Sequence, residues 1–228
     1  MHARSRTRPV WGYLLALCLL AAGCSPDTPG ATGMSSSVTG KNSVPGKSDQ
    51  GDQKHLHRLN PQPRQGYEIT YRVEGAPGPF EDTGAFGNYV TQGCHFVTNA
   101  WAGATATPSR QIPIEVRRID DRTYSATVYL DAMLDEDYYG NGVCRWQLLD
   151  VSAGFSALPA GKDNIFGVSY GPEAITAGEA VTKHYHVEDY PPDGPRGGGM
   201  GLHTSLVEQA RAEGKALFSI TATARPLP

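Results

Sequence analysis

An alternation of apolar and polar residues at period two is the sequence feature that most constrains the fold. It is clearest at the start of the folded part, where Tyr67, Ile69, Tyr71 and Val73 alternate with charged or hydroxyl side chains. Successive side chains of a strand point to opposite faces of a sheet, so this run predicts a strand with one buried face. We therefore place the folded domain at residues 65–228.

Alternation recurs further along the chain. Residues 112–116 and 124–130 alternate in the same way, and Asp120-Asp121 lies between them, which predicts an antiparallel hairpin. Further strands are expected at residues 94–98, 143–151, 165–170, 181–187 and 216–224.

One helix is expected near the C-terminus. It should begin at Ser205, whose hydroxyl has capping-box spacing to the Glu208 carboxylate, and end near Gly214. Short strands separated by turns rich in Gly and Pro predict a mainly β fold, an antiparallel β-sandwich with one short C-terminal helix. An immunoglobulin-like topology is one arrangement that this pattern allows.

The N-terminus reads as a secretory signal. Three arginines precede an apolar stretch at residues 10–22 that is too short to span a bilayer. Residues 21–24 resemble the lipobox of bacterial lipoproteins, which implies a signal peptide at residues 1–23, lipidation of Cys24 and a lipid anchor in the membrane. Ser25 after the cysteine implies the outer membrane, facing the periplasm. The alternative is an ordinary secretory signal that is cut near Ala22.

Composition separates a linker from the domain. Residues 25–64 contain almost no aliphatic side chains, so with Cys24 they are expected to form a flexible linker, about 35 Å across as a coil. Residues 65–228 contain 12 Lys and Arg against 20 Asp and Glu, a formal net charge of −8. Such a domain repels phosphate backbones, so nucleic acid is not an expected partner.

Four cysteines occur in the chain. Cys18 lies in the signal and Cys24 is used by the anchor, which leaves Cys94 and Cys144. In an oxidising compartment these two predict a disulfide, and two separate buried thiols are the alternative.

A Gly-x-Ser-x-Gly motif at residues 167–171 raises the alternative of a serine esterase, because Asp189 and His203 follow Ser169 in the order of α/β-hydrolases. That site needs a strand, a tight turn and a helix on a parallel sheet. Pro172 follows the motif directly, and no alternation of strands and helices surrounds it. We therefore expect no catalytic residues and no enzyme activity.

Gly178, His184 and His186 match the opening of the cupin metal motif, and Glu188 would share a strand face with the two histidines. The second cupin motif is missing, so strand histidines without a metal are the preferred interpretation, and no cofactor is expected.

Carboxylates are densest at Asp131 and at residues 135–137. Trp146 stands where an EF-hand loop requires its closing glutamate, so that interpretation fails, although the pattern leaves calcium binding open. A solvated acidic turn and a partner-binding surface remain as two explanations.

The stretch from Asp131 to Trp146 reads D-x3-D-E-D-Y-Y-G-x-G-V-C-x-W. Together with the strand at residues 67–73, the segment 77–79 and Cys94, it resembles small proteobacterial lipoproteins found beside lipase-type effectors of type VI secretion. The resemblance covers residues 65–150 and implies an immunity protein that binds and blocks such an effector.

Exposed aromatics beside charges suit interfaces, so the expected contact residues are Asp135, Glu136, Asp137, Tyr138 and Tyr139. The alternative function is a housekeeping outer-membrane lipoprotein with an envelope or assembly role.

Overall fold

The computed structural model describes residues 56–159, 164–190 and 199–228. The expected signal peptide at residues 1–23, the lipidated Cys24 and the linker up to residue 55 lie outside the described residues. In the part of the chain that the structure describes, no helix has the length and apolar character needed to cross a membrane.

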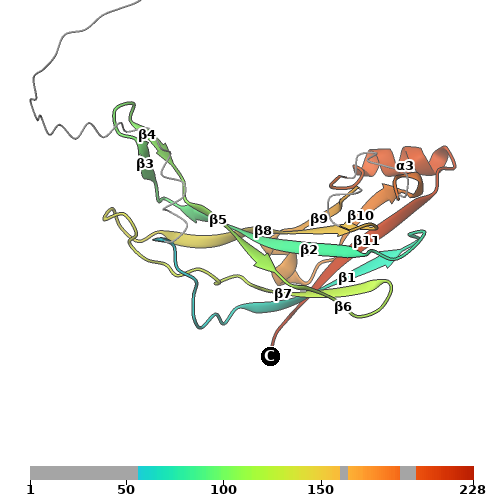
Figure 1. Ribbon diagram of the computed structural model, residues 1–228, viewed down its shortest axis with the longest axis horizontal. Coiled ribbons are helices and arrows are strands. Elements are labelled where there is room, and N and C mark those ends of the chain that lie inside the picture. The colour runs from blue at the N-terminus through green and yellow to red at the C-terminus, as the bar shows by residue number, and fades with distance from the viewer. Residues whose placement is uncertain (1–55, 160–163, 191–198) are drawn as a thin grey trace, which may run out of the picture. The chain divides into compact units, whose positions relative to one another are not determined.

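Two antiparallel sheets form the body of the protein (Figure 1). The five-stranded sheet has the order β10 (Val181–His186), β11 (Leu217–Pro226), β1 (Gly66–Glu74), β7 (Thr123–Tyr129), β6 (Val116–Arg118). The four-stranded sheet has the order β5 (Ser109–Ile114), β2 (Asp82–Gln92), β8 (Arg145–Ser156), β9 (Phe166–Tyr170). A separate hairpin of β3 (Phe96–Asn99) and β4 (Ala104–Ala106) connects β2 to β5. The expected mainly β, antiparallel sandwich is confirmed.

The core lies between the two sheets and is filled by the alternating residues. Ile69, Tyr71 and Val73 of β1 are at most 2% exposed, which confirms the period-two prediction for this strand. The ring of Phe155 in β8 lies 5.4 Å from that of Tyr71, measured between centroids, and packs edge-on against it. Residues from both sheets therefore interdigitate, as they do in other sandwiches.

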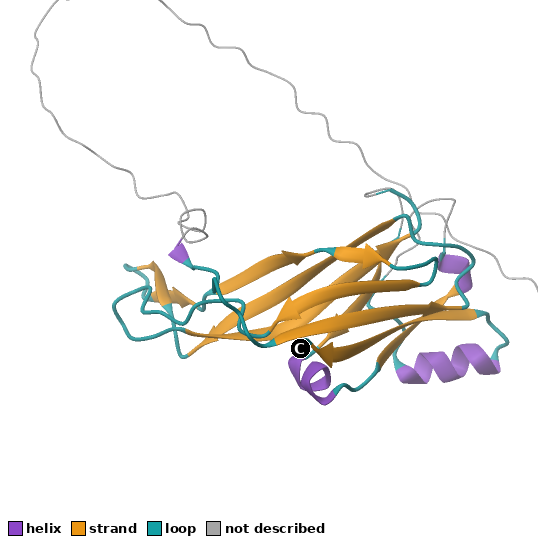
Figure 2. Cartoon of the chain, turned by 90° about the horizontal axis from the view of Figure 1, so that it is seen from below, coloured by secondary structure: helices purple, strands orange, loops and turns teal. Residues whose placement is uncertain are grey.

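Helices are short and lie beside the strands: α2 (Pro172–Ala177), the 3-10 helix η1 (Val187–Asp189) and α3 (Thr204–Ala212) (Figure 2). The predicted C-terminal helix is α3, but its cap differs from the prediction. The His203 ring, rather than the Ser205 hydroxyl, caps the helix by accepting a hydrogen bond from the Ser205 N–H. Helix α2, which buries Ile175, was not predicted from the sequence.

The predicted hairpin over residues 112–130 is wrong in its first half. Only β6 pairs with β7, whereas β5 pairs with β2 in the other sheet, so the chain changes sheets at Glu115. The topology also differs from the immunoglobulin fold, in which the first two strands are neighbours in one sheet. Here β1 and β2 belong to different sheets.

Residues 56–65, most of which we assigned to the linker, pack against the loop between β7 and β8. The Asn60 N–H donates to the Ala132 carbonyl at 2.8 Å, and the Leu134 N–H donates to the Arg58 carbonyl at 3.0 Å. The Asp131 carboxylate accepts hydrogen bonds from the N–H groups of Arg64 and Gln65. The packed structure therefore begins before residue 65, because backbone groups in this segment have partners that are distant in sequence.

Candidate binding groove

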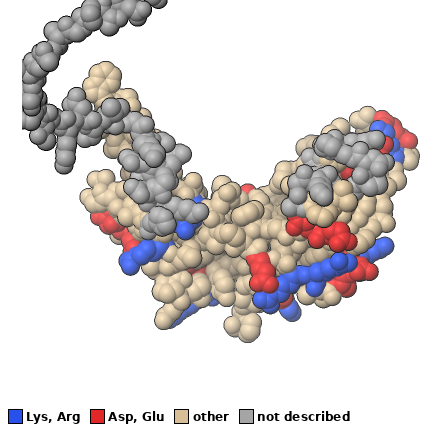
Figure 3. Space-filling model, viewed as in Figure 1, with Lys and Arg blue, Asp and Glu red and all other residues tan. Residues whose placement is uncertain are grey.

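A groove of about 870 Å³ runs over the outer face of the four-stranded sheet, from strands β5 and β2 to the base of the β3–β4 hairpin. Figure 3 shows that the visible surface beside this hairpin carries few charged side chains. The residues that line the groove are His57, Phe86, Asn88, Tyr89, Val90, Phe96, Ala106, Thr107, Pro108, Ser109, Arg110, Gln111, Pro113 and Leu149.

Two large apolar side chains of the groove are open to solvent. Phe86 of β2 is 45% exposed and Leu149 of β8 is 61% exposed. The strand register explains Leu149, because Tyr89 pairs with Leu148 and Asn88 pairs with Asp150, so Leu149 is the extra residue of a β-bulge. Bulges re-aim side chains, and this one leaves a leucine unpaired on the outer face of the sheet.

Next to these apolar residues, a row of polar side chains crosses all four strands. The Gln111 amide of β5 donates to Asn88 Oδ1 at 2.9 Å, and the Asn88 amide donates to Asp150 Oδ1 at 2.5 Å. The hydroxyls of Ser152 and Ser169 donate to the same Asp150 carboxylate, at 3.0 and 3.1 Å. These hydrogen bonds fix a polar stripe beside the apolar groove.

The groove ends at a cluster of aromatic rings that comes from segments far apart in the sequence. The His57 ring is 5.0 Å from Trp146 and 5.1 Å from Tyr138 between centroids, and its Nε2 lies 2.7 Å from Tyr139 Oη. Burial, and secondly the charge of Arg110, lower the pKa of His57. His57 was assigned to the linker, because a histidine in a polar segment gives no local sign of burial.

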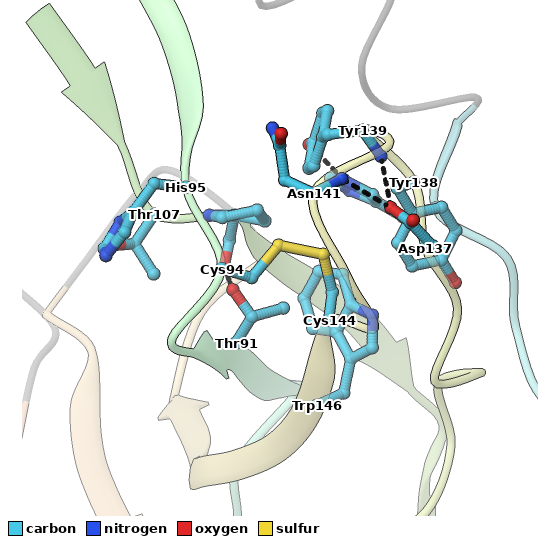
Figure 4. Close-up of a disulfide and its surroundings, with 12 residues drawn as sticks. Thr91, Cys94, His95, Thr107, Asp137, Tyr138, Tyr139, Asn141, Cys144 and Trp146 are labelled. Atoms are coloured by element: carbon cyan, nitrogen blue, oxygen red, sulfur yellow. Dashed lines mark hydrogen bonds between the residues drawn. A yellow bond between two sulfur atoms is a disulfide. The ribbon is translucent and has the colours of Figure 1, made fainter.

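Cys94 and Cys144 form a disulfide, with Cα atoms 5.1 Å apart, beside this aromatic cluster (Figure 4). Cys94 follows β2 and Cys144 precedes β8, so the bond joins the ends of two neighbouring strands of one sheet. Trp146, two residues after Cys144, lies close to the bond (Figure 4).

The five expected contact residues, Asp135 to Tyr139, belong to this region. In the structure they contact other residues of the same protein. Asp135 accepts a hydrogen bond from the Trp146 N–H at 2.8 Å, and Glu136 pairs with Arg58. Tyr138 and Tyr139 are only half-buried, and the Tyr139 ring stacks on Phe96 of β3 at 5.5 Å.

Asp137 organises the tight turn that follows. Desolvation acts to raise its pKa, but hydrogen bonds from the backbone N–H groups of Gly142, Tyr139, Gly140 and Asn141 together lower it below its ordinary value. These carboxylates therefore stabilise the loop in which they lie. Among the large apolar side chains of the groove, Phe86 and Leu149 are the exposed ones.

The serine motif lies in an antiparallel strand. Ser169 pairs with Ser152 of β8 inside β9, and α2 starts only at Pro172, so Ser169 is not on a strand-to-helix turn. Its hydroxyl donates to Asp150, while His203 caps α3. Ser169 and His203, two of the three residues of the esterase alternative, thus have separate structural partners.

The histidines of the cupin-like motif are also placed differently from the expectation. β10 ends at His186 and Glu188 lies in η1, so the three side chains do not share one strand face. Burial, and secondly Arg211, lower the pKa of His184. Within the described residues, no group of three or more His, Cys, Asp or Glu side chains is arranged to hold a metal ion.

Comparison with known proteins found no relative of this chain. The chain matches no protein family model, no curated protein and no solved structure.

Proposed function

We propose that this chain is a lipid-anchored protein on the periplasmic side of the outer membrane that acts by binding another protein. The observation that carries the proposal is the groove with exposed Phe86 and Leu149 at its floor. Open apolar side chains of this size cost free energy in water, and they are typical of surfaces that a partner covers.

The groove favours a particular chemistry in its partner. Phe86, Leu149 and Pro113 offer apolar contact, while the Asn88 and Gln111 side chains can hydrogen-bond to polar groups of an inserted segment. The formal charge of −8 over residues 65–228 favours a partner with a basic rim, because opposite charges speed encounter. An extended, mainly apolar segment flanked by Lys or Arg fits these features.

We further propose that the partner is a secreted antibacterial effector of the lipase type and that this chain is its immunity protein. This finer assignment rests on the resemblance of residues 131–146 to the lipoproteins described above, and on the expected anchor at Cys24. A tether that holds the domain in the periplasm raises its local concentration where such an effector arrives.

A strain that lacks the gene tests the immunity assignment. It should be killed by an effector encoded beside the gene, and the wild-type gene should restore survival. Survival of the deletion strain would contradict the immunity assignment and would favour the housekeeping role.

A pair of matched variants tests the groove. Leu149→Glu places a charge in the groove and should weaken binding to the purified effector at least tenfold. Ile119→Glu is the control, because Ile119 is 63% exposed, close to the 61% of Leu149, but lies in the turn between β6 and β7. Equal binding by both variants would remove the groove from the proposal.

A further inference from the structure

The β3–β4 hairpin carries the most exposed large apolar side chain among the described residues. Trp101 at its tip is 98% exposed, and Val97 on β3 is 60% exposed. We propose that this hairpin is a second membrane contact, in which Trp101 enters the interfacial layer of a lipid bilayer. The proposal goes beyond the proposed function, since it does not depend on which protein the groove binds.

The hairpin lacks the groups that resist entry into a bilayer surface. No charged residue and no histidine occurs from residue 96 to residue 109. The tip residues around Trp101 are small, with Ala100, Ala102, Gly103 and Ala104 beside it. Tryptophan combines a large apolar ring with one N–H group and prefers the interface between water and lipid tails.

Three polar backbone groups at the tip are paired within the hairpin. The Asn99 side-chain oxygen accepts hydrogen bonds from the N–H groups of Trp101 and Ala102, at 3.1 and 3.0 Å. The Thr98 hydroxyl donates to the Ala104 carbonyl at 3.1 Å. Unpaired backbone groups are costly where water is scarce, so this internal pairing suits a segment that leaves water.

The base of the hairpin is held in place. Cys94, two residues before β3, is bonded to Cys144, and Phe96 stacks on Tyr139. The arm therefore presents Trp101 from a fixed base and orders few groups on contact, which lowers the entropy cost of binding.

The hairpin stands at the end of the domain that the N-terminal segment enters. His57, which directly follows the first described residue, contacts Tyr139, and Tyr139 stacks on Phe96 of β3. Residues 25–55 separate this point from Cys24, and as a coil they would span about 30 Å. An anchor at Cys24 would therefore keep this end near the bilayer.

Charge favours a lipid surface over a protein as the occupant of the tip. The domain as a whole is acidic and is repelled by anionic headgroups, and the hairpin is an uncharged arm through which it can approach them. In Figure 3 the visible part of this arm carries neither basic nor acidic side chains. Protein hot spots cluster several large side chains such as Trp, Tyr and Arg, whereas the residues beside Trp101 in the hairpin are small.

Tryptophan fluorescence tests the proposal in the chain from residue 24 with Cys24→Ser, which keeps every described residue and attaches no lipid. This chain contains two tryptophans, Trp101 and Trp146, and Trp146 is only 9% exposed. With vesicles of phosphatidylethanolamine and phosphatidylglycerol, the emission should shift to the blue, and brominated lipids should quench it. Trp101→Ala should weaken vesicle binding about tenfold or more, Trp101→Phe should restore part of it, and Ile119→Ala should leave it unchanged.

Three results would overturn the proposal. The wild-type chain fails to bind vesicles at high lipid concentration, Trp101→Ala binds them as well as the wild type, or Trp101 stays accessible to a water-soluble quencher in the presence of vesicles. A loss of effector binding in Trp101→Ala with unchanged vesicle binding would assign the tip to a protein partner instead. Effector binding by Trp101→Ala at wild-type strength would leave the function of the groove intact.

Discussion

Removal of the Cys94–Cys144 disulfide should destabilise the protein through its unfolded state. The bond closes a segment with a sequence separation of 50 residues. In the folded chain the neighbouring residues are already paired, since Gln92 lies opposite Arg145 in the β2–β8 ladder. The native state therefore gains little order from the bond, and the gain lies in restricting the unfolded chain. For a loop of this length the chain-entropy model gives about 4 kcal/mol.

Urea unfolding followed by circular dichroism measures this effect. With a slope of about 2 kcal/mol/M, the double variant Cys94→Ala/Cys144→Ala should unfold at a midpoint about 2 M lower than the oxidised wild type. The native spectrum should stay the same, because the β2–β8 ladder does not need the bond.

The reduced wild type is the control for this variant. It loses the bond but keeps both sulfur atoms, and Cys144 is fully buried, so any difference between it and the double variant reports packing. Equal midpoints for the oxidised and fully reduced wild type would refute the reasoning, because the bond would then not lower the entropy of the unfolded chain.

Two further predictions concern the core and the buried histidine. Gly87→Ala should lower the free energy of unfolding by about 1 to 2 kcal/mol, because its Cβ would lie 2.8 Å from Cε2 of Tyr89, a ring that is 3% exposed. Gly84→Ala on the same strand meets nothing within 4 Å and should be neutral or slightly stabilising, so an equal effect of the two changes would contradict the packing argument. Because the pKa of His57 is lowered from 6.5 in the fold, the unfolded chain binds that proton first, and stability should fall as pH drops below 6.5. His57→Gln should flatten this part of the urea-midpoint profile, although His184 retains its own share, and an unchanged slope would count against His57.

The strands that sequence analysis identified are those whose alternation is carried by large side chains. β1 is the best example, since Ile69, Tyr71 and Val73 face the core at every second position. The central strand β2 was missed, although it pairs with both β5 and β8. Its inward positions include Ala85 and Gly87, and glycine in a strand weakens the pattern. Gly87 leaves room for the Tyr89 ring, which is a reason that only the packed structure reveals.

Helix α2 has typical helix-end residues in its sequence, but the helix is too short to be recognised from them. Pro172 stands at the helix start and Gly178 adopts a left-handed conformation at its end, which are the positions that these residues favour. Six residues do not complete two turns, so no apolar periodicity appears, and Ile175 is the one residue that the helix buries. The packing of α2 against the strands, rather than the helix propensity of its residues, therefore stabilises it.

The acidic loop shows how much composition alone can say about a cluster of charged residues. The sequence left two explanations for the cluster at residues 135–137, a solvated acidic turn and a partner-binding surface. In the structure, Asp135 and Asp137 accept hydrogen bonds from backbone N–H groups close to them in sequence, and Glu136 pairs with Arg58, which precedes it by 78 residues. Only the folded structure reveals an ion-pair partner at that sequence separation. The exposed apolar residues Phe86 and Leu149 belong to no sequence motif, so they could not be predicted as contact residues.

The ordered segment before residue 65 leads to a last prediction, that the groove depends on it. Arg110 Nη1 donates to the His57 carbonyl at 3.3 Å, and both residues line the groove. A chain that starts at residue 65 would lose this wall, the two backbone hydrogen bonds to the loop after β7, and the ring that fills the space between Tyr138 and Trp146. At about 1 kcal/mol for each net hydrogen bond and a similar amount for the buried ring, its free energy of unfolding should fall by about 3 to 4 kcal/mol.

A chain that starts at residue 46 is the matched control, because it keeps the whole compact unit from Gly46 to Pro228 and removes only sequence before it. Its urea midpoint should equal that of the chain from residue 25. His57→Ala in this longer chain should reproduce part of the loss while keeping the backbone hydrogen bonds of Arg58 and Asn60. If the chain from residue 65 is as stable as the control, the segment only rests on the domain surface, and the wall that it adds to the groove is not fixed by these contacts.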